Sequence, residues 1–173
     1  MIKIKKPSDA PPPKPGGFVW KFLASFFGTG FSPVAPGTVA SAVSFAILWF
    51  IPNDIWPFWM ATVALCFLGV PISSKAEEYW GKDPSKVVID EVAGCMITVL
   101  FLPKTLVLWV IGFLGFRFYD ILKLPPGRAA ERRLPKGWGI MTDDIVAGIY
   151  AFILAHLFNL LFPKLAIWTP WIS

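Results

Sequence analysis

Residues 38–72 read TVASAVSFAILWFI, then Pro52-Asn53-Asp54, then IWPFWMATVALCFLGVPI. The two apolar stretches, Thr38–Ile51 and Ile55–Ile72, predict a helical hairpin, because proline in the short connection ends the first helix. Three further apolar stretches follow, Val92–Leu102, Leu106–Phe118 and Ile145–Phe162, and Pro103-Lys104-Thr105 separates the first two of them as a second hairpin connection. We therefore predict an all-α fold with about five apolar helices.

Composition favours a membrane bundle over a water-soluble one. Of the 173 residues 55% are hydrophobic and only 16% are charged, and the mean hydropathy is +0.62. Soluble domains carry about a quarter charged residues. The 9 Trp and 16 Phe suit the interfaces of a bilayer. A disordered chain, a coiled coil and a disulfide-stapled domain are excluded. Several stretches are shorter than the roughly 20 residues of a straight span, so a soluble bundle stays open as an alternative.

The charges predict one orientation. If the N-terminus is cytoplasmic and all five stretches cross, every Lys and Arg except Lys104 and Lys164 lies on the cytoplasmic side. Residues 1–17 then form a disordered or surface-lying basic tail, and residues 18–173 form a single helical membrane domain whose segment 18–37 is re-entrant or interfacial. The net charge of +5 points to anionic membrane lipids as partners and not to nucleic acid. The sequence predicts no oligomeric state.

Acidic residues gather on that same side, where apolar stretches begin or end. These residues are Asp90, Glu91, Asp120, Asp143 and Asp144. A carboxylate at the end of an apolar helix lowers the stability of the protein unless it is paired or bound to a cation. Oxygen ligands at a wet interface suit Mg²⁺ with phosphate oxygens as co-ligands. Gly94 and Gly148 each follow an acidic doublet by about one turn and would allow two helices to approach closely. Helix capping by these acids is the simpler alternative.

Cations and a glycine-rich loop complete the predicted site. Arg117, Asp120 and Lys123 are spaced i, i+3, i+6 and share one helical face, so Arg117 and Lys123, with Arg128, are candidate phosphate-binding residues. The alternative is a surface ion-pair ladder. Ser32 and Thr38 lie in or beside the loop Gly28–Gly37 and would line a headgroup pocket, unless that loop is only a structural turn. Other phosphatase chemistries lack their residues, since the single histidine, His156, lies inside an apolar stretch.

Four ordered blocks resemble the phosphatidylglycerophosphatase A family over about residues 25–150. The blocks are Gly28-Thr29-Gly30-Phe31-Ser32-Pro33-Val34-Ala35-Pro36-Gly37-Thr38, Asp90-Glu91-x-x-Gly94-x-x-Ile97-Thr98, Arg117-x-x-Asp120-x-x-Lys123 and Gly137-x-Gly139-Ile140-Met141-x-Asp143-Asp144-Ile145-Val146-Ala147-Gly148. The resemblance implies a multi-pass bacterial inner-membrane enzyme that uses Mg²⁺ to convert phosphatidylglycerophosphate to phosphatidylglycerol, with its active site facing the cytoplasm. Leu124 stands where the family usually has proline, which changes the loop but removes no chemical group.

Rival functions remain at this stage. A membrane cation transporter would also gather carboxylates, but nearer the bilayer centre and without flanking cations. A CDP-alcohol phosphotransferase would need an Asp-rich signature with an internal arginine, which we do not find in the sequence. A soluble all-α relative with another phosphomonoester substrate is the third alternative. For each phosphatase function considered, the expected catalytic and metal-binding residues are Asp90, Glu91, Asp120, Asp143 and Asp144.

Overall fold

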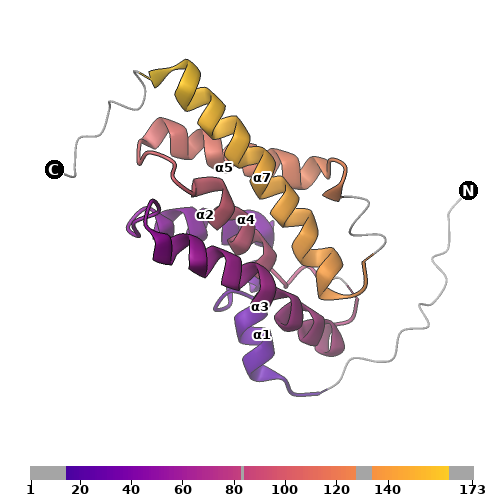
Figure 1. Cartoon of the computed structure of the whole chain (residues 1–173). Helices are drawn as coiled ribbons and strands as arrows, with labels where there is room; N and C mark the ends of the chain where they lie inside the picture. Colours follow the sequence, from indigo (N-terminus) through magenta and orange to yellow (C-terminus); the bar gives the residue numbers. More distant parts are fainter. Residues whose placement is uncertain (1–14, 83, 128–133, 164–173) are drawn as a thin grey trace, which may run out of the picture.

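The computed structural model describes residues 15–82, 84–127 and 134–163, and this part of the chain contains helices but no strands. The helices are α1 (Phe18–Ala24), a short 3₁₀ helix η1 (Thr29–Phe31), α2 (Pro36–Leu48), α3 (Trp56–Trp80), α4 (Ile89–Val99), α5 (Leu106–Leu122) and α7 (Gly137–Leu161). Figure 1 shows them packed side by side in a bundle, with α7 lying across it. The all-α prediction is confirmed.

Successive long helices run in opposite directions, so the bundle has two distinct ends. One end holds the starts of α2, α4 and α7 and the final turns of α3 and α5. The other end holds the two short connections that the prolines predicted. These connections touch there, because the Asn53 side-chain amide donates to the carbonyls of Val99 and Leu102, and Lys104 Nζ lies 2.7 Å from the carbonyl oxygen of Trp49.

Helix α4 is the centre of the bundle. It contacts α2, α3, α5 and α7, and eight of its 11 residues are buried. Its closest approach is to α7 at paired glycines: a Cβ added to Gly148 would lie 2.6 Å from the carbonyl oxygen of Gly94. The predicted role of Gly94 and Gly148 in helix approach is therefore confirmed. At about 1.5 Å per residue, α4 is roughly 16 Å long and too short to cross a bilayer alone.

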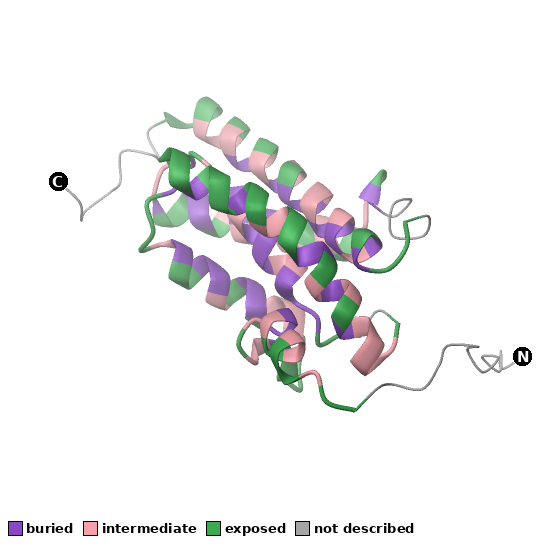
Figure 2. Cartoon of the chain, turned by 60° about the horizontal axis from the view of Figure 1, so that its bottom comes forward, coloured by how far each residue is buried: buried purple, intermediate pink, exposed green. Residues whose placement is uncertain are grey.

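The outside of the bundle is also apolar. On the outer helices buried residues face inward and exposed residues outward (Figure 2), and many of the exposed ones are large hydrophobics such as Phe67 on α3 and Leu160 on α7. Within the described residues, α3 and α7 are the two helices long and apolar enough to span a membrane. In each, only 28% of the most apolar window is buried, so most of this surface faces outward.

Helix boundaries differ from the sequence prediction by up to four residues in α2, α4 and α5, and by eight residues at the end of α3 and the start of α7. Helix α3 continues through Pro71 to Trp80, because small buried residues such as Ser73 and Ala76 keep its inner face packed. Helix α7 begins at Gly137, eight residues earlier than predicted, where the missing side chain admits the carbonyl of Val70. Helix α1 was not predicted. Most of the predicted basic tail, residues 1–14, lies outside the described residues.

Candidate active site

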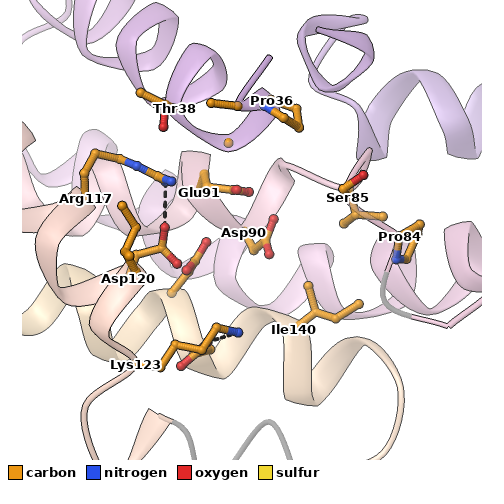
Figure 3. Close-up of a pocket in the computed structure, with 16 residues that line it drawn as sticks. Pro36, Thr38, Pro84, Ser85, Asp90, Glu91, Arg117, Asp120, Lys123 and Ile140 are labelled. Atoms are coloured by element: carbon orange, nitrogen blue, oxygen red, sulfur yellow. Dashed lines mark ion pairs between the residues drawn. The ribbon is translucent and has the colours of Figure 1, made fainter. Parts of the chain in front are cut away.

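A cavity of about 410 Å³ opens at the end of the bundle where α2, α4 and α7 begin. Figure 3 shows side chains from α2, α4, α5 and α7 pointing into it. Its polar and charged lining residues are Thr38, Ser85, Asp90, Glu91, Arg117, Asp120, Lys123, Asp143 and Asp144. All five predicted acids thus line one cavity, although they come from three helices.

Three of the carboxylates form a tight cluster. Asp90 and Glu91 lie in the first turn of α4 and Asp144 lies on α7, and each offers an oxygen within 4.8 Å of the other two. The Gly94–Gly148 crossing produces this proximity, since it brings α4 and α7 together one turn away. Asp144 is only 3% exposed. Like charges held this close out of water repel strongly unless a proton or a cation is bound between them.

The cluster has free ligand capacity. Oδ1 of Asp90 and Oε2 of Glu91 are buried and have no hydrogen-bond partner among the described residues. Burial raises the pKa of Asp90 well above its ordinary value, and the neighbouring Glu91 and Asp144 raise it further. Burial also raises the pKa of Glu91, while nearby Arg117 opposes this shift. Unpartnered carboxylate oxygens at this spacing fit a hard divalent cation such as Mg²⁺.

Two ion pairs flank the cluster, and Figure 3 marks both. Arg117 Nη1 lies 2.7 Å from Oδ2 of Asp120, within the last turns of α5. Lys123 Nζ lies 2.9 Å from Oδ2 of Asp143, which joins the end of α5 to α7. The Arg117–Asp120 pair is an i, i+3 contact of the ion-pair-ladder alternative, although both side chains are largely buried, whereas the pair between helices could not be predicted from spacing.

The acids of α7 sit differently from the prediction. Asp143 and Asp144 lie in the second turn of the helix and not at its mouth, because α7 begins at Gly137. Neither residue can therefore be an N-cap of α7. Asp90 and Glu91 do lie in a first turn, but Val88 is the N-cap residue of α4 and no side chain caps that helix. The capping alternative is thus wrong for both doublets.

The remaining predicted residues divide into three groups. Thr38, Arg117 and Lys123 line the cavity. Ser32 does not line it, and its hydroxyl donates to the carbonyl of Val34, 2.9 Å away. Arg128 lies outside the described residues.

Sequence inspection missed Ser41, and it placed Gly37 in the pocket-lining loop without the contact to Glu91. Ser41 Oγ lies 3.1 Å from Nη1 of Arg117 and donates to the carbonyl of Gly37, so it holds the guanidinium against α2. Its signal in the sequence is a polar residue inside an apolar stretch, one turn after the glycine-rich loop. Gly37 itself leaves room for Glu91, since an added Cβ would lie 2.2 Å from Oε1 of that carboxylate.

The charge balance of the cavity limits its chemistry. Five carboxylic acids and two cations line it among the described residues, and both cations already pair with acids. A phosphomonoester dianion would meet net repulsion there unless a cation or protons offset the acids. The single histidine lies further along α7, with Nδ1 2.9 Å from the carbonyl oxygen of Phe152, so it does not reach the cavity. The lining can therefore bind a divalent cation together with a phosphate group, through its carboxylates and its two cations.

Comparison with known proteins defines the class. The family model for phosphatidylglycerophosphatase A matches residues 22–159. Phosphatidylglycerophosphatase A of Escherichia coli is 36% identical over 133 residues, covering 75% of this chain and 77% of its own length. The protein of the same name from Haemophilus influenzae is 37% identical over 137 residues, covering 76% of this chain and 83% of its own.

A third relative carries a different name. A putative phosphatidylinositol-3-phosphatase of Bacteroides thetaiotaomicron is 38% identical over 147 residues, covering 79% of this chain and 91% of its own length. No solved structure matches the chain significantly.

The chain belongs to the phosphatidylglycerophosphatase A family, as the four sequence blocks implied. It is therefore a phosphatase enzyme. Family membership and the two long apolar helices together indicate a membrane-associated protein.

Proposed function

We propose that this enzyme hydrolyses the terminal phosphomonoester of phosphatidylglycerophosphate, giving phosphatidylglycerol and inorganic phosphate. The observation that carries the proposal is the convergence of five acids, Arg117 and Lys123 on one cavity, in a chain of this family. In the reaction a bond forms between water oxygen and phosphorus, and the bond between phosphorus and the glycerol oxygen breaks. The glycerol oxygen leaves with a proton.

The acids would hold Mg²⁺, with Asp90, Glu91 and Asp144 as the first candidates, because their oxygens already lie within 4.8 Å of one another. Bound there, Mg²⁺ would offset their charge and polarise a phosphate oxygen. Arg117 presents a planar fork of donors to phosphate, and Asp120 and Ser41 fix its orientation. Lys123 is more exposed and would meet the phosphate from the side of Asp143.

The bundle would lie in the bacterial inner membrane as a multi-pass protein, with the cavity end at the cytoplasmic face. This orientation rests on the asymmetry of charge: the connection between α2 and α3 and that between α4 and α5 hold only Asp54 and Lys104 as charged residues. Helices α3 and α7 would cross the bilayer, and α2, α4 and α5 would complete the bundle between its faces. Anionic lipids would contact the basic residues at the cavity end.

A second substrate is suggested by the relative from Bacteroides thetaiotaomicron, whose name specifies phosphatidylinositol 3-phosphate. Both lipids are phosphomonoesters on a diacylglycerol phosphodiester. They differ in the alcohol that carries the phosphate, which is a primary glycerol hydroxyl in one and a secondary ring hydroxyl in the other. The shared chemistry would use the same acids, and the size of the cavity would decide between the alcohols.

Phosphate release from detergent-dispersed lipids tests the function. We expect rapid release from phosphatidylglycerophosphate, slower release from phosphatidylinositol 3-phosphate, and little from glycerol 3-phosphate, which lacks the acyl chains. Removing Mg²⁺ with EDTA should abolish release, and adding Mg²⁺ back should restore it. Equal turnover of glycerol 3-phosphate and the lipid would indicate a soluble-type phosphatase, and no release from any of them would contradict the proposal.

Reporter fusions test the orientation. Fusions within 75–86 and 120–143 should report a cytoplasmic location, and fusions at Asp54 and Lys104 should report the opposite side. A reporter at 120–143 found outside the cell would remove the shared cytoplasmic acidic face.

A further inference from the structure

An apolar groove of about 430 Å³ runs between α2 and α5, beside the acid-lined cavity and separate from it. Its walls include Ala42 and Ala46 from α2, Trp49 directly after that helix, and Leu106, Val110 and Phe113 from α5. All of its lining residues are apolar. The groove takes no part in the chemistry described above, so what it binds is a separate question.

The groove continues the line of the cavity along the same two helices. On α2, Thr38 lines the cavity, and Ala42 and Ala46 follow it at one-turn intervals on the same face. On α5, Arg117 lines the cavity and Phe113 precedes it by one turn. A molecule with a phosphate in the cavity therefore has the groove one helical turn away along the α2–α5 seam, past the Ser41–Arg117 contact and towards the other end of the bundle.

Small and large side chains together create the hollow. Ala42 and Ala46 leave space on α2, while the floor is a rigid set of edge-to-face aromatic rings. The ring centroids of Phe45 and Trp109 are 5.7 Å apart and those of Phe45 and Phe113 are 5.5 Å apart. Val110, on the rim, is 45% exposed. Covering an apolar hollow and its exposed apolar rim with apolar material is favourable, and such patches often mark binding sites.

We propose that this groove binds one acyl chain of the lipid substrate while the phosphate lies in the cavity. The inference rests on the proposed lipid phosphatase function and adds the site that recognises the tail. From Thr38 to Leu48 the seam extends about 15 Å along α2, at 1.5 Å per residue. The groove starts one turn from cavity-lining residues on both helices, is lined by aliphatic and aromatic side chains, and is open to the side, as entry of a lipid from the bilayer requires.

A second copy of the chain is the competing occupant. Ala42 and Ala46 form a small-xxx-small pair of the kind that lets membrane helices approach each other closely. However, Phe50 and Leu106 stand at the far end of the groove, 83% and 69% exposed. Such projecting side chains hold a second helix away from the alanines, whereas a flexible acyl chain passes between them.

Tryptophan substitutions that fill the groove test the proposal. Val110→Trp and Ala46→Trp place a large ring in the hollow from its two walls. Leu114→Trp is the matched control, because Leu114 is 58% exposed on α5, one turn from Val110, and lines neither the groove nor the cavity. Each variant is assayed in detergent with long-chain phosphatidylglycerophosphate and with its dihexanoyl analogue.

We expect each groove variant to lower the ratio of long-chain to dihexanoyl kcat/KM by about tenfold, because the long chain loses apolar contact that the short chains never fully made. Leu114→Trp should leave that ratio within about twofold of the unchanged chain. An unchanged ratio in both groove variants would overturn the proposal. So would an equal loss for the two substrates accompanied by a smaller particle mass in light scattering, which would assign the groove to a second copy.

The unsubstituted enzyme separates this proposal from the one on which it rests. If it hydrolyses neither lipid, the lipid phosphatase function fails and the groove proposal fails with it. If it hydrolyses both and the groove variants keep the original ratio, only the groove proposal fails. Should a tryptophan variant not fold, Ala46→Leu fills less of the hollow and is expected to lower the ratio in the same direction.

Discussion

Both ends of the bundle bury polar side chains. At one end these side chains are hydrogen-bonded, and at the other end some of their oxygens have no partner in the described structure. At the end with the short connections, the Asn53 amide donates to two backbone carbonyls of the neighbouring connection, and Thr105 Oγ1 accepts from the backbone N–H of Leu108 at the start of α5. At the cavity end, Asp90 and Glu91 each keep a buried oxygen without a partner in the described structure.

This difference separates groups that stabilise the fold from groups that act on a ligand. A buried polar atom that is hydrogen-bonded in the free protein has little capacity left for a ligand. A buried carboxylate that lacks a partner costs stability, and it persists where function requires it. The comparison predicts that substitutions at one end should change stability and that substitutions at the other should change turnover.

The largest effect is expected at the acid cluster. Asp144→Asn and Asp90→Asn keep the shape of the side chain but remove its charge, so each should lower turnover by on the order of 100-fold or more in a phosphate-release assay. Stability without Mg²⁺ should hold or rise, because repulsion among Asp90, Glu91 and Asp144 is relieved. The rise in melting temperature on adding Mg²⁺ should shrink.

Asp143→Asn tests an acid outside the cluster of three, because Asp143 pairs with Lys123 and is not a member of that cluster. It should also lower turnover by on the order of 100-fold, but with a larger share of the loss in KM, since Lys123 loses its fixed position. Full activity in both Asp143→Asn and Asp144→Asn would contradict a metal site built from these acids.

Gly148→Ala should lower both the stability of the fold and the turnover. The new Cβ would lie 2.6 Å from the Gly94 carbonyl oxygen, so α4 and α7 must move apart. Overpacking of this kind costs about 1–3 kcal/mol of unfolding free energy, and turnover should fall about tenfold or more as the acids separate. Ile149→Ala, on the exposed side of α7, is the control for both measurements. Unchanged turnover would show that the crossing does not set the acid geometry.

Asn53→Ala should affect stability alone. The carbonyls of Val99 and Leu102 would lose their shared donor, which costs about 2 kcal/mol. For a chain of this size the melting temperature in detergent should fall by roughly 4–8 °C, while kcat of the folded enzyme stays unchanged. A loss of kcat below the melting transition would break the proposed division between the two ends.

Ser41→Ala should give the smallest effect. Arg117 keeps Asp120 but loses the hydroxyl that holds it against α2, so kcat/KM should fall about fivefold, equivalent to one hydrogen bond of roughly 1 kcal/mol. Ser41→Thr keeps the hydroxyl and should restore most of the activity. Ser44→Ala is the matched control, since Ser44 donates to the Ala40 carbonyl one turn along and does not contact Arg117. Equal losses in the Ser41→Ala and Ser44→Ala variants would indicate a general effect on α2.

The helices and the convergence of the acids were predictable for simple reasons. Apolar stretches bounded by proline define the hairpins, and alternating helix directions bring the starts of α4 and α7 and the end of α5 to one end of the bundle. The acids at those ends then meet without any further information. The role of Gly94 and Gly148 followed from their spacing behind the acidic doublets.

The remaining features depend on contacts that one sequence does not display. Helix α7 starts at Gly137 because that glycine packs on the Val70 carbonyl, a contact between residues far apart in the chain. The Lys123–Asp143 pair also joins two different elements. Helix α1 has only seven residues and no side-chain cap at its N-terminus, so nothing in its sequence distinguishes it from the loop that follows.

The central, short helix α4 has a consequence for biogenesis. It carries Asp90 and Glu91 in its first turn and is too short to span a membrane alone, so it is a poor substrate for independent insertion. Its widest contact surface is α7, which begins about 40 residues after α4 ends. At a synthesis rate of roughly 5–20 residues per second, α7 begins to be synthesised about 2–8 seconds after α4 is complete. During this interval the nascent chain has neither its acid cluster nor cover for the Gly94 face.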